Sequence, residues 1–414
     1  MKRKILKTAP LIYILLCLAA APCVYAASGD AGQPGSFLNF GAGARALGMG
    51  KAYVGLADDA TAVYWNPSCL SKIHSNELVI LHAIMFEDTT YDFISFSYPT
   101  LNIGTFGLGV TYLRSTGFEG RTGNNEAIGS FDETNLAVFF SYGVKLFKNA
   151  GAGTSIKIIN QAIGEFKGYA VGIDFGLWYA PFDFLGLGLM VENVLQPRMK
   201  LKDEEEVYPV GLKLGTNIKL ADNKVNINID AGKIGASGIK LKGGAEYRPY
   251  EYFAVRAGLD ETEITGGLGV YYKEYGLEYA LGSQSLGFSH RVSFSWTFGT
   301  FDIKVEAEPK IFSPFGTKKE VEIRLLGSGR FGLKNWDVVI KNKKGVIVRK
   351  FSGEGQPADG LKWDGKNENG NYVADGKYDI ELKLFDKVGE IRTAFDTVNM
   401  ETSVPETNIQ MEIR

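Results

Sequence analysis

Four glycines lie close together in the segment GAGARALGMG: Gly41, Gly43, Gly48 and Gly50, with Arg45 between them. Closely spaced glycines beside a cation can form a phosphate-binding loop. A dinucleotide site also needs a strand before the glycines and a helix after them, and the preceding stretch SGDAGQPGSFLNF is not a buried strand. No Gly-Lys-Ser or Gly-Lys-Thr follows either. We therefore expect a small-residue segment packed against other backbone, and no nucleotide site.

Side chains that could act in catalysis or bind a metal are too scattered for either. His74, His82 and His290 are far apart, and Cys69 is the one cysteine outside the N-terminal leader. A single cysteine forms neither an internal disulfide nor a zinc site. The chain also lacks the G-x-S-x-G and H-E-x-x-H motifs. We therefore expect no enzymatic activity, no metal and no cofactor.

Residues 1–26 have the pattern of a secretory signal peptide. Four basic residues precede a short apolar run, LIYILLCLAAAP, and Val24–Ala26 fits a small-x-small cleavage site. Cleavage removes four positive charges and no negative ones, which moves the formal net charge from −2 to about −6. A mildly acidic mature chain gives no support for a nucleic-acid partner.

Residues 76–300 alternate between large apolar side chains and small or polar ones. In YAVGIDFGLWY, every second residue from Tyr169 to Tyr179 is large and apolar, and VNINIDA and FSHRVSFSWTF repeat the pattern. Such period-2 alternation predicts strands with one apolar face. We count about 14 of them, most near the roughly 10 residues of a membrane-spanning strand.

Two all-β folds fit this alternation. A soluble β-sandwich also alternates, but one of this size would need domain breaks, and none is visible before residue 300. The small and polar face is mostly Gly, Ser and Asn with isolated charges, which suits the lumen of a barrel. The pattern therefore favours an antiparallel transmembrane β-barrel of about 14 strands.

The predicted connections differ between the two ends of the barrel. One side has short turns such as PTLN and APFD, and the other has longer loops, including RSTGFEGRTGNNEAIGSFDE at 114–133. In bacterial barrels the short turns face the periplasm. An even strand count then places both ends of the barrel segment in the periplasm.

The segment between the signal and the barrel carries a family resemblance. GARALGMGKAYVGLADDATAVYWNPSCL resembles the start of the PorV/PorQ outer-membrane proteins and, more distantly, of the FadL-type hydrocarbon transporters. The resemblance implies a fourteen-stranded barrel with residues 27–75 folded inside it as a hatch. Side chains alone do not fill a lumen of this size, and Gly48 and Gly50 would let the hatch backbone approach glycine-lined strands.

Asn66 and Pro67 have two interpretations. In the FadL-type proteins an Asn-Pro motif closes the hatch, and these residues match it, which implies a gating role. Alternatively, Pro67 only ends a short helix around DDATAVYW. Both interpretations stay open at the level of the sequence.

After Phe298 the sequence becomes polar, and short strands return over residues 303–414. The stretch from Asn335 to Asp386 resembles the Ig-like repeat of the flagellar hook-capping FlgD family, which implies a small Ig-like β-sandwich. The even strand count and the short turns place this domain in the periplasm. Its predicted core includes Trp336, Val338 and Val346. A Ca²⁺ site at Asp364 and Asn367 is poorly supported, because the preceding SPFGTKK lacks the acidic residue of related domains. The residues that carry the FlgD-type signature are Trp363, Asp364, Gly365, Asn369, Gly370, Asp375, Gly376 and Tyr378.

These observations predict a protein of the outer membrane of a diderm bacterium, in contact with outer-membrane lipid. One expected function is passage or binding of hydrophobic or amphipathic small molecules, as the FadL-type resemblance implies. The alternative is a role in protein secretion or surface attachment, as the PorV resemblance implies, with a periplasmic or secreted protein as partner.

Overall fold

The computed structural model describes residues 34–402 except 87, 285–286, 300–301, 329–331, 358–359 and 388–390. The predicted signal peptide lies outside the described residues. The chain divides into two compact units, Met1–Phe298 and Gly299–Arg414.

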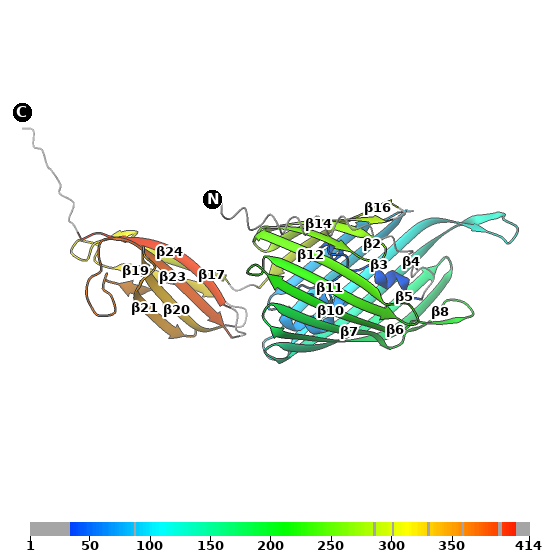
Figure 1. Ribbon diagram of the computed structural model, residues 1–414, viewed down its shortest axis with the longest axis horizontal. Coiled ribbons are helices and arrows are strands. Elements are labelled where there is room, and N and C mark those ends of the chain that lie inside the picture. Colours follow the sequence, from blue (N-terminus) through cyan, green and yellow to red (C-terminus); the bar gives the residue numbers. More distant parts are fainter. Residues whose placement is uncertain are drawn as a thin grey trace, which may run out of the picture. The chain divides into compact units, whose positions relative to one another are not determined.

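Fourteen of the described strands close into an antiparallel barrel in which neighbours along the chain are neighbours in the wall (Figure 1). The ring closes because the first strand pairs with both the second and the last strand. The predicted all-β barrel of about 14 strands is thus confirmed. The wall strands are β1 (Asn76–Ile84), β2 (Thr89–Pro99), β3 (Thr105–Arg121), β4 (Ala127–Phe147), β5 (Ala150–Ile163), β6 (Phe166–Phe182), β7 (Leu185–Leu195), β10 (Gly211–Leu220), β11 (Val225–Ile234), β12 (Lys240–Tyr250), β13 (Phe253–Leu259), β14 (Ile264–Tyr272), β15 (Tyr275–Gln284) and β16 (Gly287–Phe298).

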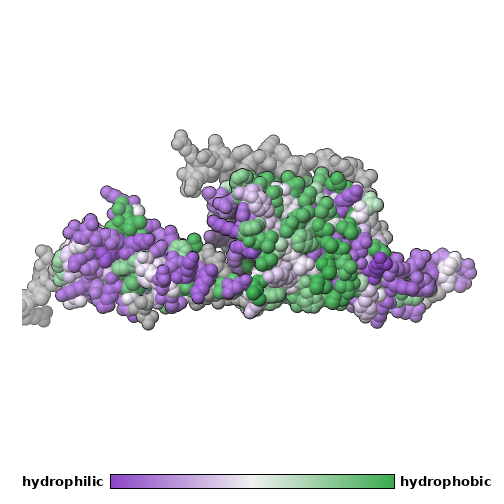
Figure 2. Space-filling view, turned by 90° about the horizontal axis from the view of Figure 1, so that it is seen from below, coloured by the Kyte–Doolittle hydropathy of each residue, from purple (hydrophilic) through white to green (hydrophobic). Residues whose placement is uncertain are grey.

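Alternation along each strand separates an apolar exterior from a mixed interior. In β6, Tyr169, Val171 and Phe175 are exposed on the outside, whereas Ala170 and Asp174 are buried inside. Figure 2 shows the result as a broad apolar surface over the barrel, with hydrophilic residues towards its ends. A continuous apolar exterior on a closed barrel is typical of a wall that faces lipid.

The two ends of the barrel differ. At one, which we call the turn end, β1 begins, β16 ends, and connections are short, such as 148–149 and 251–252. Aromatic rings stack there in pairs, with Phe182 and Phe184 5.4 Å apart and Tyr250 and Tyr252 5.2 Å apart. Such pairs are typical of an aromatic girdle at a membrane interface. At the opposite loop end, residues 196–210 carry a small hairpin of β8 (Arg198–Lys200) and β9 (Glu205–Val207).

The predicted loop 114–133 is wrong. β3 and β4 continue through it as a paired hairpin with its turn at 122–126, and this hairpin extends beyond the other strands (Figure 1). The register shifts between Ser115 and Phe118, and Phe118 stacks on Phe131 at 5.5 Å. The stretch lacks alternation because neither face is buried, yet cross-strand pairing and ring contacts continue the ladder.

Residues 34–75 lie inside the barrel, where Figure 1 shows them in blue. Most of their side chains are buried. We call residues 34–75 the plug. No helix of the described residues combines the length and apolar character needed to cross a membrane. The described plug helices are η1 (Ser36–Asn39), α2 (Ala44–Leu47), α3 (Ala62–Trp65) and η2 (Pro67–Lys72).

The second unit is a β-sandwich. One sheet has the order β17-β19-β22, the other β18-β24-β23-β20-β21, and side chains of both form one core around Trp363, Ile380 and Val338. The segment after Phe298 that reads as polar contains two of these strands. Val346, predicted in the core, is exposed because it ends a turn before its strand begins. The strands are β17 (Asp302–Glu308), β18 (Ile311–Phe312), β19 (Val321–Ser328), β20 (Leu333–Asn342), β21 (Ile347–Glu354), β22 (Leu361–Trp363), β23 (Gly376–Asp386) and β24 (Ile391–Met400).

Candidate functional site

The plug backbone lies directly against glycines of the barrel wall. A Cβ atom added to Gly258 would overlap the backbone nitrogen of Gly50, and one added to Gly188 would overlap the carbonyl of Val54. At these points only glycine lets wall and plug approach so closely. We call the ten glycines whose added Cβ would collide with the plug the glycine belt. They lie on eight of the described wall strands and are Gly107, Gly109, Gly143, Gly151, Gly153, Gly176, Gly188, Gly215, Gly244 and Gly258.

Gly50 and Gly48 both lie in the plug next to the wall, with different clearance. Gly50 has a φ of 62°, and an added Cβ would lie 2.5 Å from the carbonyl oxygen of Leu259 and 2.7 Å from that of Gly243. Gly48 is looser, because its added Cβ would lie 3.2 Å from the carbonyl oxygen of Ala44. Gly50 is therefore the tighter of the two predicted positions.

Asn66 is fully buried and joins the plug to strand β6. Its Nδ2 donates to the carbonyl of Val54 at 3.1 Å and to that of Leu177 in β6 at 3.3 Å. Its Oδ1 accepts from Ser68 N at 3.2 Å, which caps η2, and Pro67 is the first residue of that helix. Asn66 and Pro67 thus lie at the boundary between the helices α3 and η2. In addition, the hydrogen bond to Leu177 attaches Asn66 to the wall.

The four predicted hatch residues do not form one cluster. Asn66 and Pro67 meet the wall at the glycines of β4–β6, whereas Gly48 and Gly50 meet it near β12–β14. These strands lie on opposite sides of the ring. The four residues therefore mark two separate places where the plug is seated.

The sequence interpretation missed Arg45, which holds the plug to the wall. Its Nε and Nη2 donate to the two carboxylate oxygens of Glu246 on β12, at 2.9 and 3.0 Å. Its Nη1 contacts Asp58 of the plug at 2.6 Å. A bidentate arginine–carboxylate pair fixes orientation as well as charge. The available signal was a lone arginine in a run of small residues.

Glu246 is also part of a charged network within the wall. Arg256 of β13 donates to Glu246 at 2.8 Å and to Glu278 of β15 at 3.2 Å. Tyr271 donates to Glu278 at 2.5 Å and accepts from Arg256. All four residues are at inward positions, so the network lines the lumen between the plug and β12–β15.

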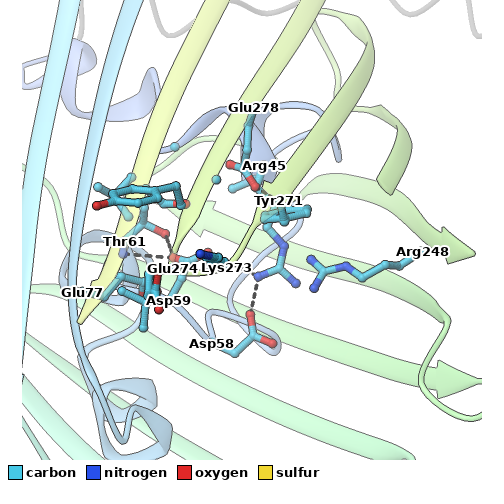
Figure 3. Close-up of a pocket in the computed structure, with 17 residues that line it drawn as sticks. Arg45, Asp58, Asp59, Thr61, Glu77, Arg248, Tyr271, Lys273, Glu274 and Glu278 are labelled. Carbon is cyan, nitrogen blue, oxygen red and sulfur yellow. Dashed lines mark hydrogen bonds and ion pairs between the residues drawn. The ribbon is translucent and has the colours of Figure 1, made fainter. Parts of the chain in front are cut away.

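A cavity of about 290 Å³ lies next to this network at the turn end (Figure 3). The plug contributes Arg45 and Asp58, and the wall contributes charged side chains from β1, β12 and β15. Most of its labelled lining is charged, so it suits water and ions better than an apolar molecule. Residues labelled around it include Asp59, Thr61, Glu77, Arg248, Lys273, Glu274 and Glu278.

A second ion-pair group holds the plug near the loop end. Lys51 lies 3.0 Å from both Asp260 and Glu263, in the connection between β13 and β14, and Arg291 lies 2.6 Å from Glu263. Burial acts to raise the pKa of Asp260, but Lys51 and the backbone amide of Thr262 lower it to about 2. The carboxylate thus stays ionised and paired with the plug.

The opposite part of the lumen, next to β1–β6, is largely apolar, although it includes the buried ion pair of Lys157 and Asp174 at 2.7 Å. Rings of the plug pack there against the wall, with Phe40 5.6 Å from Tyr91 and Tyr64 6.1 Å from Phe93. Towards the loop end, Met199 of the β8–β9 hairpin joins the same cluster. We give the name apolar sector to the part of this group nearest the loop end. It consists of Phe37, Leu38, Phe40, Leu81, Ala83, Tyr91, Phe93, Leu113, Ala137, Ile159, Ala170, Met199 and Tyr208.

The ladder between β6 and β7 is interrupted beside this sector. Ile173 faces Leu195, but Phe175 faces Val191, so β7 carries two extra residues. Asn193 in this bulge has a φ of 58°, and its backbone N–H donates to Asp174 at 2.7 Å. Bulges are common where a strand must bend or a wall must admit a ligand.

The FlgD-type signature residues shape the second unit. Trp363 is buried against Tyr378 with ring centroids 5.2 Å apart, and its Nε1 donates to the carbonyl of Lys366 at 2.9 Å. Asp375 accepts from Thr402 N at 2.9 Å. The signature glycines Gly365, Gly370 and Gly376 have positive φ angles, a conformation that glycine adopts readily.

Asp364 and Asn367, considered for Ca²⁺, serve their own turns. Asp364 accepts from Lys366 N at 3.1 Å, and Asn367 accepts from Asn369 N and Asn371 N at 3.0 Å. Across the described residues, no group of three or more His, Cys, Asp and Glu side chains is arranged to hold a metal ion. These side chains therefore act as turn residues in this structure.

Two stretches of the chain match protein-family descriptions. Residues 31–172 match the uncharacterised protein family UPF0164, and residues 331–386 match the FlgD Ig-like domain. No curated protein sequence matches the chain. The second match agrees with the predicted FlgD-type resemblance, and the PorV/PorQ resemblance stays a prediction.

Several solved barrels are similar to this chain. The CymD monoaromatic hydrocarbon channel has a TM-score of 0.49 at 12% identity, over 62% of this chain and 98% of CymD. The Pseudomonas putida toluene transporter TodX has a TM-score of 0.48 at 13% identity, over 62% and 99%. A Pseudomonas aeruginosa FadL homologue has a TM-score of 0.44 at 10% identity, over 61% and 97%.

Proposed function

We propose that this chain is an outer-membrane β-barrel that binds hydrophobic or amphipathic small molecules and lets them pass when the plug shifts. The observation that carries the proposal is the apolar sector, which reaches from the loop end into the lumen and is closed by the plug. When the plug shifts, an apolar ligand can take over the apolar contacts that the plug made with the wall. This exchange costs little free energy, because the apolar surface stays out of water. The closed barrel with its apolar exterior supports contact with outer-membrane lipid. The protein acts without catalysis and without a cofactor.

The route leads away from the turn end. There an apolar molecule would have to separate Arg45 from Glu246 and enter a cavity lined by charges, and leaving a buried charge unpaired is costly. The interrupted β6–β7 ladder offers a sideways route instead, because fewer hydrogen bonds must break there. Asn66 binds β6 next to that bulge, which supports a gating role for this residue.

Uptake of an apolar fluorescent dye by intact cells tests this function. Cells that lack the protein are expected to take up the dye more slowly, and Met199→Glu is expected to slow uptake similarly because it puts a charge into the apolar sector. Lys200→Glu is the matched control, since Lys200 lies on the same short strand but is exposed. Equal dye uptake with and without the protein would refute the function.

We further propose that the turn end and the second unit face the periplasm. Short turns at that end and an even strand count support this orientation. A protease-sensitive tag inserted at the exposed Glu354 should be cut only after the outer membrane is permeabilised. Cleavage in intact cells would place the second unit outside and reverse the orientation.

A second candidate function is the docking of secreted or periplasmic proteins. The observation that favours it is the long β3–β4 hairpin, which carries the exposed Phe118–Phe131 pair beyond the wall. An exposed aromatic pair on a projecting hairpin suits protein recognition. Deleting residues 116–130 separates the two candidates, because docking would be lost while dye uptake would remain.

A further inference from the structure

Several buried polar groups in or beside the apolar sector have no partner within the protein. Among them are the hydroxyls of Tyr91, Ser95, Thr111 and Tyr208 and the side-chain oxygen of Asn135. These five residues are at most 1% exposed. Buried polar groups are normally hydrogen-bonded, so a group of exceptions in one place needs an explanation.

Strand register brings three of these groups together. Tyr91 of β2 faces Leu113 of β3, which in turn faces Asn135 of β4. Thr111 lies two residues from Leu113, on the same inward face of β3. The three residues that carry these groups therefore flank Leu113 on three adjacent strands.

Tyr208 reaches the sector from the loop end. Its ring lies against Gly35 of the plug, where an added Cβ would approach it to 2.6 Å. Phe40, at the other end of η1, contacts the ring of Tyr91. The N-terminal part of the plug is thus held between two tyrosines whose hydroxyls are both unpaired.

The charge of this region selects among ligands. The sector residues on β2 and β3 are uncharged. On β4, Glu133 accepts from Asn135 Nδ2 at 2.8 Å. On β5, the buried Lys157 is already paired with Asp174 at 2.7 Å. A carboxylate ligand would meet the negative Glu133 and a lysine that is already paired, whereas a neutral hydroxyl could donate to Asn135 Oδ1 and accept from Tyr91 or Thr111.

We propose that the apolar sector binds an uncharged apolar molecule that carries a hydroxyl group, with the hydroxyl held by Tyr91, Thr111 and Asn135. The ligand takes the place of the plug side chains Phe37 and Phe40. This proposal rests on the proposed function and narrows its substrate class from apolar molecules in general to neutral alcohols.

Binding of three radiolabelled probes of equal chain length tests the proposal: decane, 1-decanol and decanoate. The full-length protein is held in lipid nanodiscs, and each probe is measured against empty nanodiscs. Wild type is expected to bind decanol more tightly than decane or decanoate. Tyr91→Phe and Thr111→Val are each expected to weaken decanol binding about 5- to 10-fold, the value of one hydrogen bond, and to leave decane binding unchanged.

Thermal stability separates this role from a structural one. Removing an unpaired buried hydroxyl is expected to leave the melting temperature of the barrel unchanged or to raise it. Tyr142→Phe is the matched control, because the Tyr142 hydroxyl is already paired with the carbonyl of Ile103 at the turn end. That variant should leave decanol binding at the wild-type level.

The outcomes distinguish this inference from the proposed function. If wild type binds decane as tightly as decanol, the hydroxyl site is refuted while apolar binding stands. The same holds if Tyr91→Phe and Thr111→Val leave decanol binding unchanged, or weaken decane binding as much as decanol binding. Decanoate bound as tightly as decanol would refute the choice of a neutral ligand. If none of the three probes binds, both the inference and the proposed function fail.

Discussion

Gly50→Val is expected to open the closed barrel to ions. The added Cβ would lie 2.5 Å from the carbonyl oxygen of Leu259 and 2.7 Å from that of Gly243, and both are backbone atoms of the wall. The φ of 62° is a further obstacle, because a β-branched residue rarely adopts it. The plug must therefore move away from β12 and β13. Planar-bilayer recordings should show steady conductance where the wild type is closed.

Two glycine variants serve as controls for this result. An added Cβ at Gly243, which is in the wall itself, meets nothing within 4 Å, so Gly243→Val should remain closed. Gly48→Val should have an intermediate effect, since its nearest contacts are at 3.2 and 3.3 Å. A Gly50→Val protein as closed as the wild type would show that the plug is not seated against these strands.

Arg45→Met is expected to loosen the plug without changing its size. Arg45 is the plug's cation for Glu246, and both side chains are largely buried. Removing one partner of a buried ion pair typically costs about 3–5 kcal/mol. Arg256 still donates to Glu246 at 2.8 Å, so we expect a cost at the lower end of this range. The urea concentration at which the barrel begins to conduct should therefore fall well below that of the wild type.

A charge variant elsewhere tests whether this effect is specific. Arg198→Met removes an exposed pair with Glu205, whose free energy is less than about 1 kcal/mol. It should therefore hardly change the urea concentration at which the barrel begins to conduct. If Arg45→Met and Arg198→Met begin to conduct at the same urea concentration, Arg45 does not hold the plug.

The strands could be predicted because the alternation of apolar and small residues is visible within each strand's own sequence. Tyr169 to Tyr179 alternates so regularly that its two faces are evident without any partner strand. The 114–133 stretch could not be predicted in this way, because outside the lipid neither face needs to be apolar. There the pairing of Phe118 with Phe131 depends on contacts across the hairpin.

The seat of the plug was predictable only in part. Small residues from Gly41 to Gly50 indicate close backbone approach, and the structure places Gly50 in such an approach. The sequence does not show which wall strands these residues contact, because the contacts are long-range. Arg45 and its partner Glu246, for example, are 201 residues apart in the chain. Likewise, nothing local shows that Asn66 reaches β6.

The pairing of β1 with β16 also determines how the molecule can be assembled. β1 follows the plug directly, yet one of its edges has no partner until the last wall strand has been made. An exposed edge of this kind readily pairs with the wrong strand. Contacts between residues so distant in sequence also form slowly. We expect residues 34–75 to lie within the curving sheet before this seam closes. Afterwards they would have to enter through one end of the closed barrel.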